Sequence, residues 1–497
     1  MALHVFNSMT RSKELFTPIH APYVGMYVCG PTVSGESHLG HARPYITFDI
    51  VYRYLLALGY KVRYVRNITD AGHFEEEGRV AEDKVGGKAK LERLEPMELV
   101  QKYTNLFHDA MDALGNHRPS IEPTATGHIP EQISMIQDLI EKGLAYERNG
   151  SVYFDVRRYA AAGQYGQLSG RIIEDMIAGS RELDGQQEKN DPADFALWKK
   201  APEEHIMRWN SPWGEGFPGW HIECSAMATK YLGKHFDIHG GGMDLQFPHH
   251  ESEIAQSTVC NGCAPVKYWM HNNMITVNGK KMGKSYNNTI TLRELFSGAH
   301  ALLEKAYAPM TVRFLILQTH YRSTLDFSNE ALQSAEKGLS RLMSAAVIMK
   351  GYAKGDISKV GSSATDVQIQ TLIAECTQYM DDDFNTAMTL ANLFEMASIA
   401  FAVKNMQVAA GEVSEGALAL MAQTFERFVY EIFGLQDAAQ KDASKMDEVM
   451  QVLMNIRKEA RAKKDFATSD LIRNQLSEKG INIKDEKDGT VSWTINE

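Results

Sequence analysis

APYVGMYVCGPTVSGESHLGH, residues 21–41, decides the fold of this chain. Its first eight residues are an apolar run that predicts a buried strand, and the glycines and prolines that follow end this strand. Residues 44–60 then carry apolar side chains at helical spacing, and residues 61–70 predict a second strand. A strand, a glycine-bearing turn, a helix and a strand in this order form a βαβ unit of the nucleotide-binding kind.

The rest of the chain divides by its patterns into the second half of this domain and two later units. Residues 209–285 are rich in glycine and histidine and hold another strand–turn–helix pattern, and residues 119–208 separate them from the first half. This spacing predicts a Rossmann-type parallel-sheet α/β domain split by an insertion. Residues 326–436 predict an all-α helical bundle. Two helices and a hairpin in residues 437–497 predict a small C-terminal α/β unit.

Composition narrows the class of protein. The 497 residues, 44% hydrophobic and 23% charged, predict a soluble globular protein, and a net charge of -11 means that any contact with nucleic acid must come from a local basic patch. The N-terminus lacks the apolar core of a signal peptide, and no run approaches the ~18 apolar residues of a membrane span. Five irregularly spaced cysteines make no disulfide framework, so we expect a cytoplasmic protein with free thiols.

Two short motifs suggest a site for phosphate. His38-Leu39-Gly40-His41 lies where the first turn meets a helix N-terminus, whose N–H groups bind phosphate, and the glycine lets a ligand approach the backbone. The segment KMGKS, residues 281–285, places Lys281 and Lys284 on a loop after a strand, where they can clamp negative charge on phosphate. Alone, each motif is a weak signal, since an ordinary loop or a solvated basic turn gives the same letters.

Cysteine and histidine residues suggest a metal site. Cys29 ends the first strand, and the second region supplies Cys224 in PGWHIECSAM together with His249, His250, Glu251 and Glu253 in FPHHESEIAQS. His249 and Glu253 are four residues apart, so they lie on one face of a helix. Two thiolates, an imidazole and a carboxylate make a zinc set, and we expect His250 and Glu251 to lie outside it. We expect Cys260 and Cys263 to be structural or exposed, and Cys376 to be packed inside a helical unit.

Together and in this order, HLGH and KMGKS resemble the HIGH and KMSKS signatures of class I aminoacyl-tRNA synthetases, with Leu39 in place of isoleucine and Gly283 in place of serine. Further motifs narrow the resemblance to the cysteinyl-tRNA synthetase family, and it runs across nearly the whole chain. These motifs are GPTV, NITD (67–70), DFALWK (194–199), PGWHIECSAM (218–227), GGGMDLQFPHHESEIAQ (240–256), DDDFNTAMTLANL (381–393) and KKDFATSDLIR (463–473).

The resemblance gives each segment an expected role. It implies a catalytic domain in residues 1–118 and 209–268, a connective insertion in 119–208, a region of the KMGKS loop and of contacts with the tRNA stem in 269–325, a tRNA-binding bundle in 326–436 and an anticodon-binding unit in 437–497. It also implies one zinc ion per chain, held by residues matching Cys29, Cys224, His249 and Glu253. Thr32, Trp220 and Asp244 are expected at the amino-acid end of the site.

The remaining candidate residues concern ATP and tRNA. We expect His38, His41, Lys281 and Lys284 to be catalytic and to hold the phosphates, with Gly40, Gly240 and Gly241 approached by ATP, which brings Mg²⁺. A basic patch in the last unit is expected to contact tRNA, where Trp493 stacks on a base. The patch consists of Arg457, Lys458, Arg461, Lys463, Lys464 and Arg473. A solvated helix face and a packed indole are the alternatives.

The function that the resemblance implies is the activation of L-cysteine by ATP to cysteinyl-adenylate and pyrophosphate, then transfer to the terminal adenosine of tRNA(Cys). A hydrophobic pocket separates cysteine poorly from serine, whereas zinc binds a thiolate far better than a hydroxyl. We expect a monomer that does not contact membranes. Three alternatives stay open: a zinc hydrolase, which leaves KMGKS unexplained; a cysteine ligase acting on a small amine, which should lack the C-terminal units; and a non-catalytic RNA-binding paralogue, which should have lost motifs.

Overall fold

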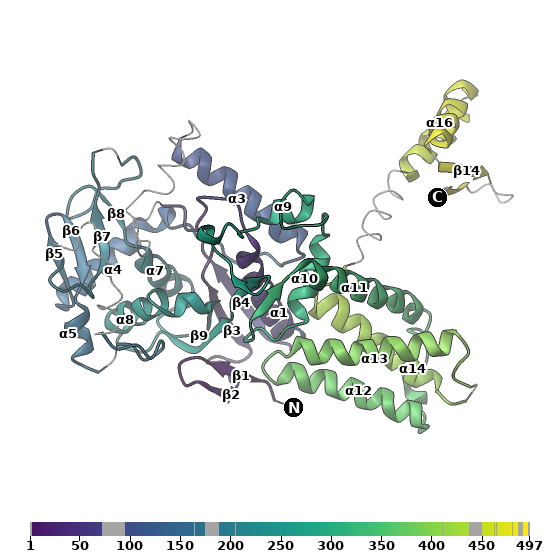
Figure 1. Ribbon diagram of the computed structural model, residues 1–497, viewed down its shortest axis with the longest axis horizontal. Coiled ribbons are helices and arrows are strands. Elements are labelled where there is room, and N and C mark those ends of the chain that lie inside the picture. Colours follow the sequence, from purple (N-terminus) through teal and green to yellow (C-terminus); the bar gives the residue numbers. More distant parts are fainter. Residues whose placement is uncertain are drawn as a thin grey trace. The chain divides into compact units, whose positions relative to one another are not determined.

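The computed structural model describes two compact units, residues Met1–Leu435 and Gln436–Glu497 (Figure 1). The described residues are 2–71, 95–163, 165–173, 188–203, 205–409, 411–436, 450–461, 463, 465–479, 481–485 and 491–495. In the first unit, α1 (Leu39–Ala57) connects the strands β3 (Tyr23–Val28) and β4 (Lys61–Arg66), which pair in parallel. The predicted βαβ unit is therefore present.

The central sheet has four parallel strands in the order β10-β9-β3-β4. The second half of the domain supplies β9 (Phe236–Gly242) and β10 (Val266–Asn272), and β3 pairs with both β4 and β9. From β3 the chain adds β4 on one side, and the second half of the domain adds β9 and β10 on the other side, so the strand order reverses between β3 and β9. In such sheets ligands bind at the carboxyl ends of the strands beside this point. The expected domain boundary at residue 268 falls inside β10, which continues to Asn272 because its whole length pairs with β9.

The insertion folds as a second, antiparallel sheet in the order β5-β6-β7-β8. Its strands are β5 (Ala145–Arg148), β6 (Ser151–Phe154), β7 (Phe195–Lys200) and β8 (Gly216–Pro218), with α4 (Ile129–Glu141) and α5 (Val156–Ala160) beside them. Asn149 and Gly150 both have positive φ, as the tight turn between β5 and β6 requires. β8 comes from beyond the expected end of the insertion at residue 208, because three residues are too short to show a strand pattern in the sequence.

Two helices of the second half bring its polar residues to the sheet. These are α7 (Trp220–Leu232) and α8 (His249–Asn261), which pack against each other. Beyond β10 the chain forms a small sheet in the order β12-β11-β13, with β11 (Ile275–Val277), β12 (Lys280–Lys281) and β13 (Leu325–Phe327). The remaining elements of this part are β1 (His4–Asn7), β2 (Ser12–Leu15), α3 (Pro96–Ala113), η1 (Thr126–His128), η3 (Met243–Gln246), η4 (Lys284–Tyr286), α9 (Leu292–Ser297) and α10 (Pro309–Leu317).

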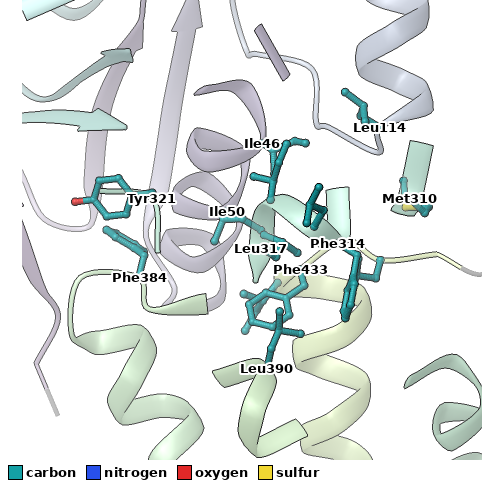
Figure 2. Close-up of a cluster of buried hydrophobic side chains, with 14 of the residues drawn as sticks. Ile46, Ile50, Leu114, Met310, Phe314, Leu317, Tyr321, Phe384, Leu390 and Phe433 are labelled. Atoms are coloured by element: carbon teal, nitrogen blue, oxygen red, sulfur yellow. The ribbon is translucent and has the colours of Figure 1, made fainter. Parts of the chain in front are cut away.

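The predicted helical bundle follows and shares a hydrophobic core with the α/β domain. It contains α11 (Asn329–Lys350), η5 (Ile357–Lys359), α12 (Ala364–Asp381), α13 (Thr386–Lys404), α14 (Glu415–Glu426) and the π-helical turn η6 (Arg427–Ile432). Figure 2 shows Ile46 and Ile50 of α1 facing Leu317 of α10, with Leu390 and Phe433 of the bundle next to them. Burial of these side chains joins α1 to the bundle.

Cys376 and the apolar helix α13 both lie in the interior of the bundle. Cys376 is fully buried on α12, as its helical pattern predicts. α13 is long and apolar enough to cross a membrane by length and composition, which the sequence analysis did not anticipate. In the structure α13 packs between α11 and α12 within the core, which is the place of the central helix of a bundle.

The C-terminal unit contains the elements that its sequence predicts. Residues 450–461 are helical, α16 (Phe466–Glu478) follows, and β14 (Ile481–Asp485) pairs antiparallel with β15 (Val491–Ile495). Within this hairpin, Ile483 lies opposite Trp493. The fold class is thus the one expected: a split parallel-sheet domain, an all-α bundle and a small α/β unit.

Candidate active site

A cavity of about 570 Å³ opens at the carboxyl ends of β3, β9 and β10. Segments far apart in the sequence meet on its wall, as expected for the edge where a parallel sheet binds ligands. Of the predicted site residues, those lining it are Cys29, Thr32, His38, Gly40, His41, Trp220, Gly241, Asp244 and Lys281. The two phosphate motifs and the amino-acid pocket that the sequence predicted separately therefore face one space.

His38 and His41 form a stacked pair at the start of α1. Their ring centroids are 3.9 Å apart. His38 caps the helix: its Nδ1 accepts from the backbone N–H of Gly40 at 3.1 Å, and the Nδ1 of His41 accepts from the N–H of His38 at 3.1 Å. Because both Nδ1 atoms accept, each neutral ring carries its proton on Nε2, the atom that can donate to a phosphate oxygen. Burial and the neighbouring His38 lower the pKa of His41 to about 3.

Gly40 is required by this pairing. A Cβ at this position would lie 3.0 Å from the ring of His38 and 2.8 Å from the methyl carbon of Met282. Any larger residue would therefore push His38 away from its capping position or displace the neighbouring loop. The glycine links the two motifs, since one contact comes from HLGH and the other from KMGKS.

The KMGKS loop is held by Asn288. Its Nδ2 donates to the carbonyl of Lys281 at 3.1 Å, and its Oδ1 accepts from the N–H of Gly283 at 2.9 Å. Lys281 is exposed at the rim of the cavity. The backbone of Lys284 begins the turn η4, and its side chain lies outside the described part of the chain. Asn288 lies outside the KMGKS motif, so no sequence pattern singles it out.

Four side chains converge at the end of β3. The ligand atoms of Cys29, Cys224, His249 and Glu253 all lie within 4.8 Å of one another. The two sulfur atoms are 3.8 Å apart, and His249 Nε2 lies 3.1 Å from Glu253 Oε1. All four residues are buried, and α8 presents His249 and Glu253 on one face, as their spacing predicts.

The charges of this cluster are strongly coupled. Burial raises the pKa of the Cys224 thiol, but a hydrogen bond from Cys29 and the charge of His249 outweigh it and lower this pKa to about 7. Burial raises the pKa of Glu253, but His239 and His249 outweigh it and lower this pKa to about 2. Thiolate and carboxylate are the forms that bind a metal. Burial raises the pKa of Cys29. Burial lowers the pKa of His249, but the charges of Cys224 and Glu253 outweigh it and raise this pKa to about 10, so a metal bound here would displace a proton from both residues. The residue types of the cluster are those of a zinc site.

A second metal-binding arrangement overlaps the first. Cys29, His239, His250 and Glu253 also bring their ligand atoms within 4.8 Å of one another. However, His250 Nδ1 lies 2.8 Å from the Nε2 of His271, and His239 Nε2 lies 2.8 Å from Glu253 Oε2. Neither His239 nor His271 was a predicted site residue. His239 lies on β9 and His271 on β10. In the sequence, only the high number of histidines between residues 205 and 271 indicated a polar site in this region.

Asn67, in the NITD segment, is a further polar residue at this site for which the sequence predicted no role. Its Oδ1 accepts from the backbone N–H of Gly30 at 2.8 Å and lies 3.7 Å from the sulfur of Cys224. It comes from the NITD segment directly after β4, the strand beside β3. Asn67 therefore fixes the turn that follows Cys29 and touches the opposite thiol.

The glycines of HGGGMD have different surroundings. Gly241 lines the cavity together with Asp244, whereas Gly240 is not among the lining residues. A Cβ on Gly240 would collide with the ring of Phe48 on α1. Glycine at position 240 is thus required by the close packing of α1 on the sheet.

Comparisons with known proteins identify the family. A family model described as the tRNA synthetases class I (C) catalytic domain matches residues 15–337, and a DALR domain matches residues 376–439. A cysteine–tRNA ligase of Bacteroides fragilis is 55% identical over 498 residues, which cover 99% of each chain, and that of Bacteroides thetaiotaomicron is 55% identical over 497 residues, again 99% of each. The chain belongs to the cysteinyl-tRNA synthetase family.

The remaining comparisons agree with this family. A model described as the cysteinyl-tRNA ligase anticodon binding domain matches residues 443–492. Among solved structures, the LeuRS–tRNA–LeuAMS ternary complex of Agrobacterium radiobacter K84 has a TM-score of 0.57 at 13% identity. The match covers 84% of this chain and 85% of that one and shows a similarity of fold.

As a cysteinyl-tRNA synthetase family member the chain is a ligase, so a zinc hydrolase is excluded. The C-terminal match argues against a small-amine ligase.

In this family member, the C-terminal unit presents part of the predicted basic patch. Arg461, Lys463 and Arg473 are exposed, and Lys464 lies outside the described residues. Arg457 is buried, so its charge cannot belong to the surface patch; the helical pattern alone did not show which face packs inward. Trp493 is half-buried on β15.

Proposed function

We propose that the chain joins L-cysteine to tRNA(Cys) in two steps at this cavity. The cysteine carboxylate attacks the α-phosphorus of ATP and expels pyrophosphate, and the cysteinyl group then passes to a hydroxyl of the terminal adenosine of tRNA with release of AMP. One observation carries the proposal: residues of HLGH, residues of the KMGKS loop and Cys29 of the Cys/His/Glu cluster line the same cavity.

The histidine and lysine residues are proposed to act on ATP. The Nε2–H groups of His38 and His41 donate to phosphate oxygens, and the ammonium groups of Lys281 and Lys284 balance the charge that grows on pyrophosphate as it leaves. Mg²⁺ accompanies ATP as a further counter-charge. The backbone of Gly40 and Gly241 gives the nucleotide close access. Catalysis then consists of positioning and electrostatic stabilisation.

Zinc fits the cluster of Cys29, Cys224, His249 and Glu253. Zinc–sulfur bonds of about 2.3 Å in a tetrahedral site separate two sulfur atoms by about 3.8 Å, which matches the observed distance of 3.8 Å. One zinc ion per chain, bound there, would favour a thiolate over a hydroxyl and so select cysteine against serine. Glu253 and the Cys224 thiolate supply the negative charge that such an ion needs.

The remaining site residues are proposed to hold the amino acid and tRNA. The ring of Trp220 lies tilted against that of His249, with centroids 4.4 Å apart, and thereby borders the thiol end of the cavity. Thr32 and Asp244 line the same cavity, where a carboxylate can pair with the amino group of cysteine. Arg461, Lys463, Lys464, Arg473 and Trp493 are proposed to contact tRNA. We propose a monomer that works in the cytoplasm.

Cysteine-dependent exchange of pyrophosphate into ATP tests the first step, and charging of tRNA(Cys) tests the second. We expect both with purified protein, and exchange only when cysteine is present. Exchange without charging would contradict the tRNA substrate but leave the adenylate step. Folded protein that performs neither reaction would favour the non-catalytic RNA-binding paralogue.

A further inference from the structure

Arg43 joins the HLGH turn to two segments that are distant in the sequence. It follows His41 by two residues on α1 and is 1% exposed. Within the described part of the chain its guanidinium donates to backbone carbonyls alone: from Nη1 to Met274 at 2.5 Å, and from Nη2 to His320 at 3.4 Å, Tyr321 at 3.3 Å and Ser323. Among the described residues no carboxylate forms an ion pair with it. The start of α1 is therefore fixed to residues 320–323.

Residues 320–323 also support the KMGKS loop. The carbonyl of Tyr321 accepts from the N–H of Asn273 at 2.8 Å, and that of Arg322 accepts from Asn273 Nδ2 at 2.9 Å. β13, which follows directly, pairs in parallel with β11, and β11 continues through a tight turn into β12 with Lys281. Both phosphate motifs thus rest on this one segment, HLGH through Arg43 and KMGKS through β11.

Asp383 holds the side chains of the same segment from the bundle. It lies in the connection between α12 and α13 and is fully buried. Its Oδ1 accepts from the hydroxyl of Tyr321 at 2.7 Å and from the N–H of Phe6 at 2.8 Å, and its Oδ2 accepts from Arg322 Nε at 2.6 Å. Figure 2 shows Tyr321 beside Phe384, close to α1.

The backbone at this contact is strained. Asp383 and Phe384 have φ of +65° and +54°, a left-handed conformation that is costly for residues other than glycine. Two such residues in succession persist only where their surroundings fix them, and the bonds of Asp383 supply that constraint. Placing this carboxylate against residues 320–322 therefore carries a cost in backbone conformational energy.

We propose that Arg43, which binds the backbone of residues 320–323, and Asp383, which binds their side chains, are positioning residues that couple the helical bundle to the HLGH and KMGKS motifs. The inference rests on the proposed function, because tRNA is the ligand expected at the bundle. tRNA contacts that move the α12–α13 connection reach residues 320–323 through Asp383 and the ATP site through Arg43. A purely structural role would instead lower stability and affect both partial reactions alike.

The first test compares Asp383→Asn with Asp366→Asn, another buried aspartate of the bundle. Asp366 caps the other end of α12, where it accepts from Ser414 and Ser363. In Asp383→Asn the amide replaces the oxygen that faces Arg322. We expect exchange without tRNA to stay within about twofold of wild type while kcat for charging falls about tenfold. Asp366→Asn should change neither. Equal losses in exchange and charging, or the same loss in both variants, would overturn the proposal.

The second test is a double-mutant cycle on charging, with tRNA saturating. Arg43→Lys keeps the charge but loses the fork of donors, and we expect about a tenfold loss of kcat. If both residues act through residues 320–323, Arg43→Lys/Asp383→Asn should lose little more than the worse single variant. Arg53→Lys, on the same helix, is the control. In Arg53→Lys/Asp383→Asn we expect the loss of kcat to equal the product of the losses in the two single variants. If the losses of the single variants multiply in both cycles, the proposed coupling of Arg43 and Asp383 is wrong. Wild-type protein without exchange would instead contradict the proposed function.

Discussion

The sulfur atoms of Cys29 and Cys224 lie 3.8 Å apart, although 195 residues separate them in the chain. Cys29 directly follows β3 and Cys224 lies on α7, so the pair forms only when the two halves of the split domain come together. This explains why the insertion can be large without disturbing the site: the sheet and α7 place both thiols, and the insertion leaves and rejoins the domain before α7 begins.

Replacing His41 should separate helix capping from catalysis. In His41→Asn the side-chain oxygen can accept from the N–H of His38 as Nδ1 does, but the Nε2–H donor is lost. We expect unchanged thermal unfolding and a loss of about 100-fold in the kcat of ATP–pyrophosphate exchange. His41→Gln can make the same capping bond through Oε1, as glutamine does at the third position of a capping box, and its amide also reaches toward the Nε2 position, so it should be as stable as His41→Asn and more active. The reverse order of activity would contradict the assignment.

The pH dependence of exchange should not report His41. Burial and His38 lower the pKa of this ring to about 3, so it is neutral throughout the range from pH 6 to pH 9. A group whose pKa is lowered in the folded state gains no proton there as the pH falls toward 6. We expect wild-type and His41→Gln profiles of kcat to have the same shape, measured by exchange at saturating cysteine and ATP. A limb near pH 6.5 present only in the wild type would contradict a neutral His41.

Gly40→Ala should slow adenylate formation without unfolding the domain. The new methyl group would lie 3.0 Å from the His38 ring and 2.8 Å from the Met282 methyl carbon. Methionine can move, whereas the stacked ring of His38 cannot without losing its cap. We expect a loss of about 10- to 100-fold in kcat for exchange. Adding Met282→Ala should restore little of it; full recovery would show that the loop, and not His38, is the sensitive partner.

Asp49→Asn should destabilise the unit strongly, because it leaves a buried guanidinium without its counter-charge. Asp49 Oδ2 accepts from Arg313 Nη2 at 2.5 Å, and both residues are buried. Burial raises the pKa of Asp49, but Arg313, His117 and Arg53 outweigh it and hold this pKa well below its usual range. We expect a loss of about 3–5 kcal/mol in the free energy of unfolding at pH 7, measured with urea.

Asp49→Asn also tests how the free energy of unfolding depends on pH. A carboxylate with a lowered pKa in the folded state stabilises above its unfolded pKa of about 3.9, and this contribution is lost as the pH falls further. The stability difference between wild type and Asp49→Asn should therefore be constant from pH 7 to pH 5 and shrink below about pH 4. A difference that grows on acidification would contradict the ion pair.

Much of the fold could be predicted from the sequence, because the apolar periods of β3, α1 and the bundle helices are long. The candidate metal residues could also be found, since His249 and Glu253 share a helix face and Cys29 ends a strand. Three-residue β8 carries no period and was missed. Asn67, Asn288 and Arg43 were missed as well, because their importance lies in contacts with backbone groups, which leave no apolar period; those groups belong to distant segments for Asn67 and Arg43 and to the preceding loop for Asn288. Burial of Arg457 depends on which helix face packs inward.

The most direct test of the central claim is metal content together with selection of cysteine against serine in exchange, for wild type, Cys224→Ser and Cys376→Ser. Cys376 is as buried as Cys224 but lies in the bundle, so it controls for burying a hydroxyl. We predict about one zinc ion per chain and a preference of about 10⁴-fold or more in wild type and Cys376→Ser, and loss of both in Cys224→Ser. Metal-free Cys224→Ser that still prefers cysteine to the same degree would contradict the account.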